Sequence, residues 1–185
     1  MKARRSIGFS LIELLVVLLV IVLLTSVVSV NVGRGGADLS QKDDVRQFAA
    51  RMMYALSEAE LTGSDFGVAI VVSQELGDVR YRAQWLRRFD QGWAAPTSAR
   101  DVFEPFVFEP GIELVLQLDD QADVDFELVS DLEMPTPQIQ FYAGGETTPG
   151  QLDWLDASTG ALLYRLTWDL FGRVEVLPRG EEQET

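Results

Sequence analysis

The sequence predicts an α+β protein in which helical segments come first and strands follow. Three observations support this class. An unbroken apolar run follows Glu13, and an apolar stripe at helical spacing lies between residues 45 and 59. After Gly63 the chain becomes a series of short strand-like segments that Pro and Gly turns separate.

The first predicted element is an apolar helix over residues 9–30. Leu14 to Val30 contains no charged residue, and its only polar residues are Thr25, Ser26 and Ser29. As a helix, residues 9–30 would extend roughly 33 Å, enough to span the ~30 Å hydrocarbon core of a bilayer. The positive charges all precede this run, at Lys2, Arg4 and Arg5. They predict a cytoplasmic N-terminus and an exported C-terminal part.

Two ordinary explanations of this run differ in how well they fit. A secretory signal peptide has an apolar core of about 7–15 residues. Here the run is longer and begins beside a carboxylate, so that explanation is disfavoured. A simple signal anchor, with Glu13 merely at the membrane interface, remains open.

A glycine-rich joint at residues 31–37 is expected to interrupt the helix. Gly33, Gly35 and Gly36 each disfavour a helix by about 1 kcal/mol relative to Ala. A second, amphipathic helix is predicted over 38–62, ending at Gly63. Its apolar stripe consists of Val45, Phe48, Ala49, Met52, Leu56 and Ala59.

The remainder of the domain, up to residue 178, is predicted to be strands. The strand segments are Phe66–Val72, Val79–Phe89, Val102–Phe108, Ile112–Leu118, Val124–Val129, Gln138–Tyr142, Leu152–Leu155, Ala161–Trp168 and Arg173–Leu177. The polar tail 179–185 is expected to be disordered.

Composition excludes several classes of function. The chain has 185 residues and a formal charge of −14, which argues against binding nucleic acid or anionic lipid. It has no His and no Cys, so it has no disulfide and no Ser-His-Asp or Cys-His catalytic site. No catalytic constellation is recognisable, and we expect no enzyme activity and no cofactor.

The residues Arg5-Ser6-Ile7-Gly8-Phe9-Ser10-Leu11-Ile12-Glu13 carry the most specific signal. This stretch resembles the N-terminus of type IV prepilins and of the pseudopilins of type II secretion. The resemblance implies a leader peptide over residues 1–8, cut between Gly8 and Phe9 by a prepilin peptidase. It also implies N-methylation of Phe9 and an intersubunit contact of Glu13 with the Phe9 amine of a neighbour.

Two inner segments are similar to the H-type minor pseudopilin of type II secretion, which is related to the FimT and FimU minor pilins. One is the helix end at residues 55–63. The other is residues 137–149, which also reads as a plain β-hairpin around Gly144-Gly145. The resemblance implies a pilin-like fold, with the amphipathic helix packed on an antiparallel β-sheet or β-sandwich.

The resemblance also implies a role and a location. The chain is expected to be a structural subunit near the tip of a periplasmic pseudopilus that drives export of folded proteins. Its expected partners are other minor pseudopilins, the major pseudopilin, the prepilin peptidase and the inner-membrane assembly platform. A minor pilin of a type IV pilus, or a membrane-tethered periplasmic binding module, are the alternatives.

Two further residue groups suggest sites that the sequence does not support. The acidic residues are Asp119, Asp120, Asp123, Asp125, Glu127, Asp131 and Glu133. Calcium prefers such ligands, but the EF-hand spacing is absent, so a solvated face is expected and no metal site is predicted. The residues Trp85, Trp93, Trp154 and Trp168 are expected to pack in the core or at an interface.

Overall fold

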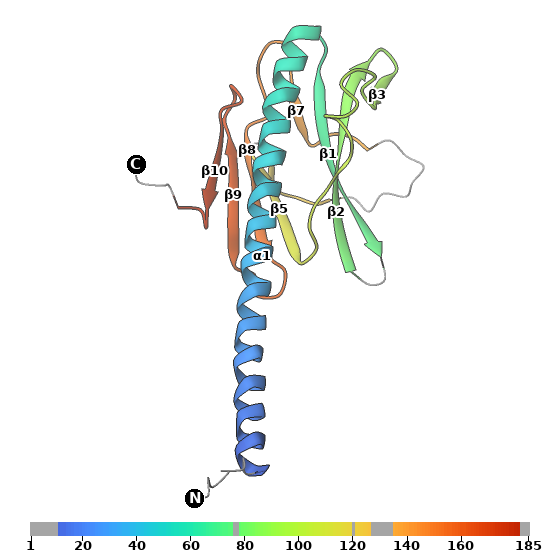
Figure 1. The fold of residues 1–185 in the computed structure, drawn as a ribbon. Coiled ribbons are helices and arrows are strands. Elements are labelled where there is room, and N and C mark those ends of the chain that lie inside the picture. Colours follow the sequence, from blue (N-terminus) through green and yellow to red (C-terminus); the bar gives the residue numbers. More distant parts are fainter. Residues whose placement is uncertain (1–10, 76–77, 120, 127–134, 182–185) are drawn as a thin grey trace, which may run out of the picture. The chain divides into compact units, whose positions relative to one another are not determined.

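The computed structural model describes residues 11–75, 78–119, 121–126 and 135–181. Side chains are described for these residues apart from 13, 22–39, 74–75, 78 and 121–123. The chain divides into two compact units, Met1–Ser40 and Gln41–Thr185. Figure 1 shows the elements, which are α1 (Leu11–Thr62), β1 (Phe66–Glu75), β2 (Asp78–Phe89), β3 (Gly92–Ala94), β4 (Phe106–Val107), β5 (Ile112–Leu118), β6 (Gln121–Val124), β7 (Ile139–Phe141), β8 (Gly150–Asp156), β9 (Leu162–Trp168) and β10 (Val174–Pro178).

The backbone of α1 is helical throughout residues 31–37, where the sequence predicts a glycine-rich joint. The predicted break in the helix is therefore wrong. Each Gly still costs about 1 kcal/mol relative to Ala, but helical turns exist on both sides, so no new nucleation is needed. The helix ends at Thr62, and Gly63 follows with a φ of 62°, a conformation that favours glycine.

The last five turns of α1 bury the apolar stripe that the sequence predicts. Val45, Phe48 and Met52 are at most 1% exposed, and Ala49, Ala55 and Ala59 are also buried. Leu56 is half-buried and packs against the same core. The three- and four-residue spacing of these positions places them on one side of a helix, so the amphipathic helix is confirmed.

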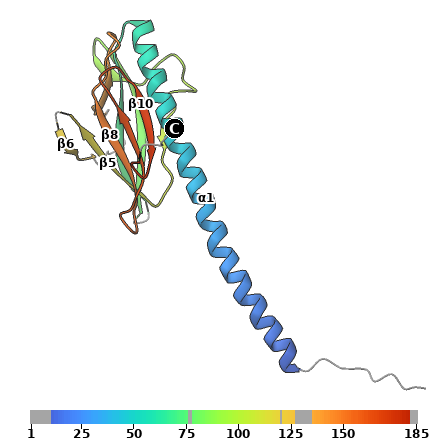
Figure 2. The same cartoon turned by 90° about the vertical axis from the view of Figure 1, so that its left-hand side faces the viewer.

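Two antiparallel sheets make up the rest of the second unit. The first has the order β3-β2-β1-β7, with β4 also paired to β2, and the second has the order β10-β9-β8-β5-β6. Long registers hold each sheet: Phe66–Glu75 pairs with Asp78–Arg87, and Ile112–Leu118 pairs with Gly150–Asp156. Successive strands of the second sheet can be followed in Figure 2. The predicted α+β class with antiparallel sheets is confirmed.

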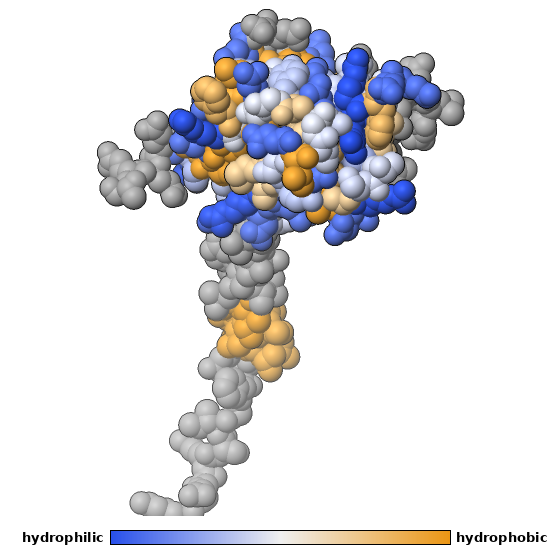
Figure 3. Space-filling view, turned by 90° about the horizontal axis from the view of Figure 1, so that it is seen from above, coloured by the Kyte–Doolittle hydropathy of each residue, from blue (hydrophilic) through white to orange (hydrophobic). Residues whose placement is uncertain are grey.

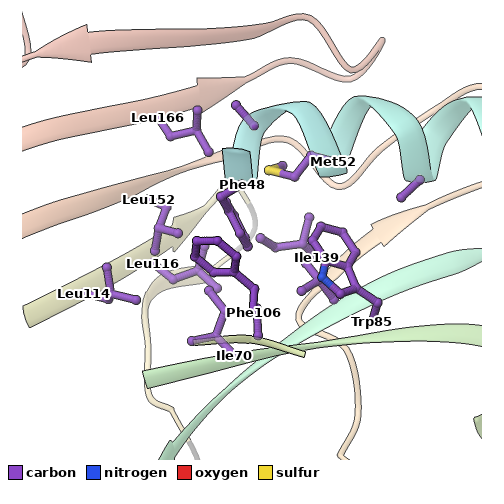
Figure 4. Close-up of a cluster of buried hydrophobic side chains, with 14 of the residues drawn as sticks. Phe48, Met52, Ile70, Trp85, Phe106, Leu114, Leu116, Ile139, Leu152 and Leu166 are labelled. Carbon is purple, nitrogen blue, oxygen red and sulfur yellow. The ribbon is translucent and has the colours of Figure 1, made fainter. Parts of the chain in front are cut away.

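The main core lies between the two sheets and the C-terminal part of α1 (Figure 4). The Phe48 ring lies 5.5–6.0 Å, centroid to centroid, from those of Trp85, Phe106, Phe108 and Trp154. These four rings come from both sheets and from the segment that joins them. The Phe48 side chain therefore contacts both sheets and the segment between them, and it stabilises their packing through apolar burial and aromatic contact.

Two strand predictions need correction, and one strand was not predicted. Of the predicted strand Val102–Phe108, only Phe106–Val107 is a strand, because Val102 and Phe103 donate their N–H groups to Ala99 O in a turn. Strand β3 was not predicted, since its three residues carry no periodic pattern. The segment predicted at 124–129 pairs earlier, as Gln121–Val124, and residues 127–129 lie outside the described part.

The beginning of the predicted disordered tail is an ordered turn. Arg179 N–H donates to Leu163 O at 2.9 Å, and Glu181 N–H donates to Pro178 O at 3.0 Å. These bonds continue the edge of β9 and β10 beyond the last residue of the strand, which composition alone does not indicate. Residues 182–185 lie outside the described part of the chain.

The other face of the first sheet carries a small second cluster. Ala69, Val71 and Leu86 are buried there, and Trp93 packs against them. Pro137 lies close to Gly67 on this side. The Gln138 side chain continues the sheet, because Ile70 N–H donates to Gln138 Oε1 at 2.8 Å and Gln138 Nε2 donates to Ile70 O at 3.2 Å.

Candidate functional site

The predicted processing residues fall outside what the structure describes. Gly8 and Phe9 are not among the described residues, and Glu13 lies in the first turn of α1 with its side chain undescribed. The cleavage site, the methylated terminus and the Glu13 contact therefore stay predictions. Among the residues that are described, no helix is long and apolar enough to cross a membrane.

The first three turns of α1 present an aliphatic surface. Every described side chain from Leu11 to Ile21 is Leu, Ile or Val. Their exposed fractions run from 85% at Leu11 to 46% at Val20, and they surround the helix rather than forming one stripe. Figure 3 shows them as a continuous hydrophobic surface. Full burial of one such side chain is worth about 1.5–3 kcal/mol, so this surface favours an apolar environment or packing on other helices.

The two inner segments that resemble the H-type pseudopilin, residues 55–63 and 137–149, meet in the second unit. Ala143 N–H donates to Asp65 Oδ1 at 2.9 Å, just beyond the C-terminal end of α1. Gly145, with a φ of 85°, lies close to the Glu60 side chain. Tyr142 N–H donates to Glu146 O at 2.8 Å, which closes a hairpin turn. The segment is therefore a hairpin turn at its glycines, closed by a single bridge between Phe141 and Thr147, and it contacts the helix end.

A buried threonine ties this hairpin to the turn between β9 and β10. Thr147 is 2% exposed, and its N–H donates to Leu170 O at 2.8 Å. Its hydroxyl donates to Asp169 O, also at 2.8 Å. Gly172, with a φ of 69°, lies against Leu56 of α1 and the methyl group of Thr147. The arrangement is structural, because each polar group is used to hold the turn.

The carboxylates whose surroundings are best defined also have structural roles. Asp153 is 8% exposed and forms a bidentate ion pair with Arg165, with both N–O distances 2.7 Å. This pairing raises the pKa of Arg165. Asp156 Oδ1 accepts bonds from the hydroxyl and N–H groups of Ser158 and Thr159, which lower the pKa of Asp156 to about 2.

Asp44 is the described carboxylate whose pKa moves upward. Burial of its carboxylate against the domain raises the pKa of Asp44, and a hydrogen bond from Glu109 N–H at 3.2 Å opposes that shift. The Asp44 carboxylate therefore does not have the geometry of an exposed general acid in a substrate cleft. The contact instead fastens α1 to the segment that leads into β5.

The acidic stretch between Asp119 and Glu133 is only partly described. Among the described residues, no group of three or more Asp or Glu side chains is placed to hold a metal ion. The described acidic side chains of the stretch are those of Asp119 and Asp125, and its other acidic side chains lie outside the described part of the chain.

Three of the four tryptophans are core residues. Trp85, Trp154 and Trp168 are at most 4% exposed, so their predicted role in packing is confirmed. Trp93 is half-buried on the other face of the first sheet.

The sequence analysis did not identify the exposed turn at Leu170 and Phe171, which are 44% and 63% exposed. In the sequence, two large apolar residues directly before Gly172 were the feature that could have indicated this turn.

Comparison with known protein families matches residues 44–172 to the family described as Type II transport protein GspH. This family consists of structural pseudopilins and not of enzymes. The chain is 24% identical to the type II secretion system protein H of Aeromonas hydrophila, over all of both chains.

Solved structures agree with this match. A crystal structure of the minor pseudopilin EpsH from the type II secretion system of Vibrio cholerae is 26% identical, with a TM-score of 0.63. The similarity covers 80% of this chain and 99% of that one. The solution structure of Escherichia coli GspH shares the fold, with 16% identity, a TM-score of 0.54, and coverage of 80% and 94%.

The family match covers more than two thirds of the chain, including α1 from Asp44, the strands from β1 to β9, and the two inner segments, residues 55–63 and 137–149. The chain therefore belongs to the type II transport protein GspH family.

Proposed function

We propose that this chain is a minor pseudopilin of a type II secretion system. It acts as a structural subunit near the tip of a periplasmic pseudopilus that drives the export of folded proteins across the outer membrane. The observation that carries the proposal is the exposed aliphatic surface of α1 from Leu11 to Ile21, in a chain of this family. A helix that is apolar on all sides needs lipid or other apolar helices around it.

The same segment serves two stages. Before assembly, residues 9–30 form a single span of the inner membrane, with the N-terminus cytoplasmic and the C-terminal domain periplasmic. The cationic residues at positions 2, 4 and 5 set that orientation. After assembly, the same aliphatic side chains pack against the corresponding helices of neighbouring subunits in the filament core.

Processing connects the two stages. The prepilin peptidase cuts between Gly8 and Phe9, and the new N-terminal Phe9 is methylated. Removal of the three cationic residues of the leader leaves a mature chain with a formal charge of −17. The Phe9 amine of one subunit then pairs with Glu13 of an adjacent subunit, since a charge in an apolar bundle requires a partner.

The partners follow from this role. They are the other minor pseudopilins and the major pseudopilin within the filament, the prepilin peptidase, and the assembly platform of the inner membrane. The second unit, residues 41–185, is folded around its own core and would present its surface to these neighbours.

Processing tests the proposal directly. Mass spectrometry of the chain from membranes should show a protein that begins at methylated Phe9. Gly8→Ala should still be processed, whereas Gly8→Val should accumulate with its leader, because a peptidase cleft close to the backbone accepts a small side chain before a branched one. An intact leader on the wild-type chain would instead favour a membrane-tethered binding module.

A second measurement separates secretion from pilus assembly. Deletion of the chromosomal copy should leave exoproteins in the periplasm, and the wild-type chain should restore their release. Loss of a surface pilus with normal secretion would assign the chain to a type IV pilus instead.

A further inference from the structure

A row of arginines lies on the outer face of the first sheet, on the side opposite the main core. Tyr81, Ala83 and Trp85 of β2 point into the core. Because side chains alternate along a strand, Arg80, Arg82 and Arg88 lie on the other side. We call these three residues the β2 arginine row. Eight residues of strand separate its ends, about 26 Å at ~3.3 Å per residue.

The row has no ion pair with any described residue, although the chain carries 29 carboxylate residues. The arginines that do pair lie in the second sheet and its turn, Arg165 with Asp153 and Arg173 with Asp169. The Arg80 Nε atom is shielded from solvent and has no hydrogen-bond acceptor among the described residues. The Arg80 and Arg82 side chains are half-buried, so part of each stays open to an incoming carboxylate, whose two oxygens match the fork of a guanidinium.

Apolar groups accompany the row. Arg82 lies opposite Val71 on β1 and opposite Val107 on β4, and Val107 is 55% exposed. Arg88 is exposed, and its guanidinium lies 5.4 Å from the centre of the Trp93 ring. Beside Trp93, the hairpin from Phe89 to Thr97 encloses a shallow hollow of about 570 Å³. Arg and Trp are enriched among residues that dominate protein interfaces.

We propose that the β2 arginine row docks a carboxylate-bearing segment of a neighbouring pseudopilin. The partner's Asp or Glu side chains would pair with Arg80 and Arg82, and an apolar residue farther along the same segment would contact Trp93, which lies opposite Arg88 at the other end of the row. This inference rests on the proposed function for the identity of the neighbour. The chemistry follows from charge: the row is cationic, so a segment that carries carboxylates has the sign that complements it.

The contact can be tested in cells with the full-length chain. A photo-crosslinking amino acid at Gln84, on the same face between Arg82 and Leu86, should join the chain to another protein that carries a prepilin signature. Mass spectrometry should place the crosslink within a segment that contains Asp or Glu. The same amino acid at Glu175, exposed on β10, is the positional control.

Charge reversal tests the chemistry. Arg80→Glu with Arg82→Glu should lower the crosslink yield about tenfold or more, whereas Lys at both positions should retain most of it. Arg100→Glu with Arg179→Glu makes the same change in net charge at two exposed residues elsewhere, and it should leave the yield unchanged. In isolated membranes, the wild-type yield should fall as salt shortens the Debye length from about 10 Å to about 3 Å.

Four results would overturn the inference. They are crosslinks confined to this chain itself, crosslinks to lipid only, equal yields from both pairs of reversals, and a yield that salt does not change. A reversal variant that fails to fold would lose its thermal transition, and the salt series and the Lys variant then decide. If α1 crosslinks to other pseudopilins persist while Gln84 gives none, this inference fails and the proposed function stands.

Discussion

At the scale of single residues, Glu13 is the position where one charge matters most. In the proposed filament its carboxylate pairs with the Phe9 amine of a neighbour inside an apolar bundle. Removing one partner of a buried pair typically costs about 3–5 kcal/mol, because the remaining charge is left unpaired. Glu13→Leu should therefore insert into the membrane and be processed at Gly8, yet enter the filament poorly. The measurements are crosslinking to other pseudopilins and exoprotein release, with the mutant as the only copy.

Asp43→Leu is the matched control for Glu13→Leu. It removes an exposed carboxylate from the same helix and should keep both crosslinking and secretion. Wild-type behaviour of a fully processed Glu13→Leu chain would remove the role given to this carboxylate.

Asp156 makes the stability of the domain depend on pH. Its pKa is about 2 in the folded chain, because Ser158 and Thr159 bond to the ionised form. A lowered folded pKa adds stability that is fully present above the ordinary pKa of about 3.8 and is lost as pH falls through about 2. Asp156→Ala should thus have a lower melting temperature than the wild type at pH 7, and the difference in melting temperature should disappear near pH 2.

Thermal melting between pH 2 and 7 measures this effect. Glu175→Ala, which removes an exposed carboxylate on β10, should show no such pH-dependent gap. An Asp156→Ala difference that is equally large at both ends of the range would mean that ionisation of Asp156 is not its source.

At the scale of elements, the turn between β9 and β10 is joined to α1 through a glycine. Gly160 and Gly172 both have a φ of 69°, but a Cβ on Gly160 meets open space, whereas one on Gly172 meets Leu56 and Thr147. Gly160→Ala should cost about 1–2 kcal/mol from the left-handed backbone alone. Gly172→Ala should cost about 1–3 kcal/mol more from overpacking.

Denaturant unfolding of the two variants gives the comparison. In a Leu56→Ala background, Gly172→Ala should lower the free energy of unfolding by less than it does in the wild-type background, because the shorter side chain makes room for the new methyl group. The effect of Gly160→Ala should be the same in both backgrounds. Equal losses for the two glycine variants would show that the turn can move away from the helix freely.

At the scale of the molecule, the second unit carries its own core. Every residue of the main core cluster lies between Val45 and Val176, within Gln41–Thr185. A chain of residues 41–185 should therefore be soluble and fold cooperatively. For about 145 residues the unfolding enthalpy should be about 100 kcal/mol near 60 °C. Calorimetry and circular dichroism measure this, and a non-cooperative transition would make residues 1–40 part of the fold.

The sequence by itself determined the class of this protein and the interior face of its helix. The spacing of Val45, Phe48 and Met52 was sufficient to predict that they are buried, because a helix with one apolar side buries only that side. Alternation was sufficient for β2, and the Gly144-Gly145 turn predicted the hairpin around it. The prepilin-like N-terminus gave Gly8, Phe9 and Glu13 as site residues, which the described structure does not test.

Only the tertiary structure decided where local preference was weak or misleading. The helix continues through residues 31–37 although three glycines disfavour it. Residues 99–103 form a turn that places Phe103 in the core, where the sequence predicts a strand from Val102. In the sequence, the arginines of β2 indicate only the polar side of a strand. The pairing of β2 with β3 shows that they share a face with Trp93. Local rules count energies of about 1 kcal/mol per residue, and burial of several side chains in a shared core exceeds them.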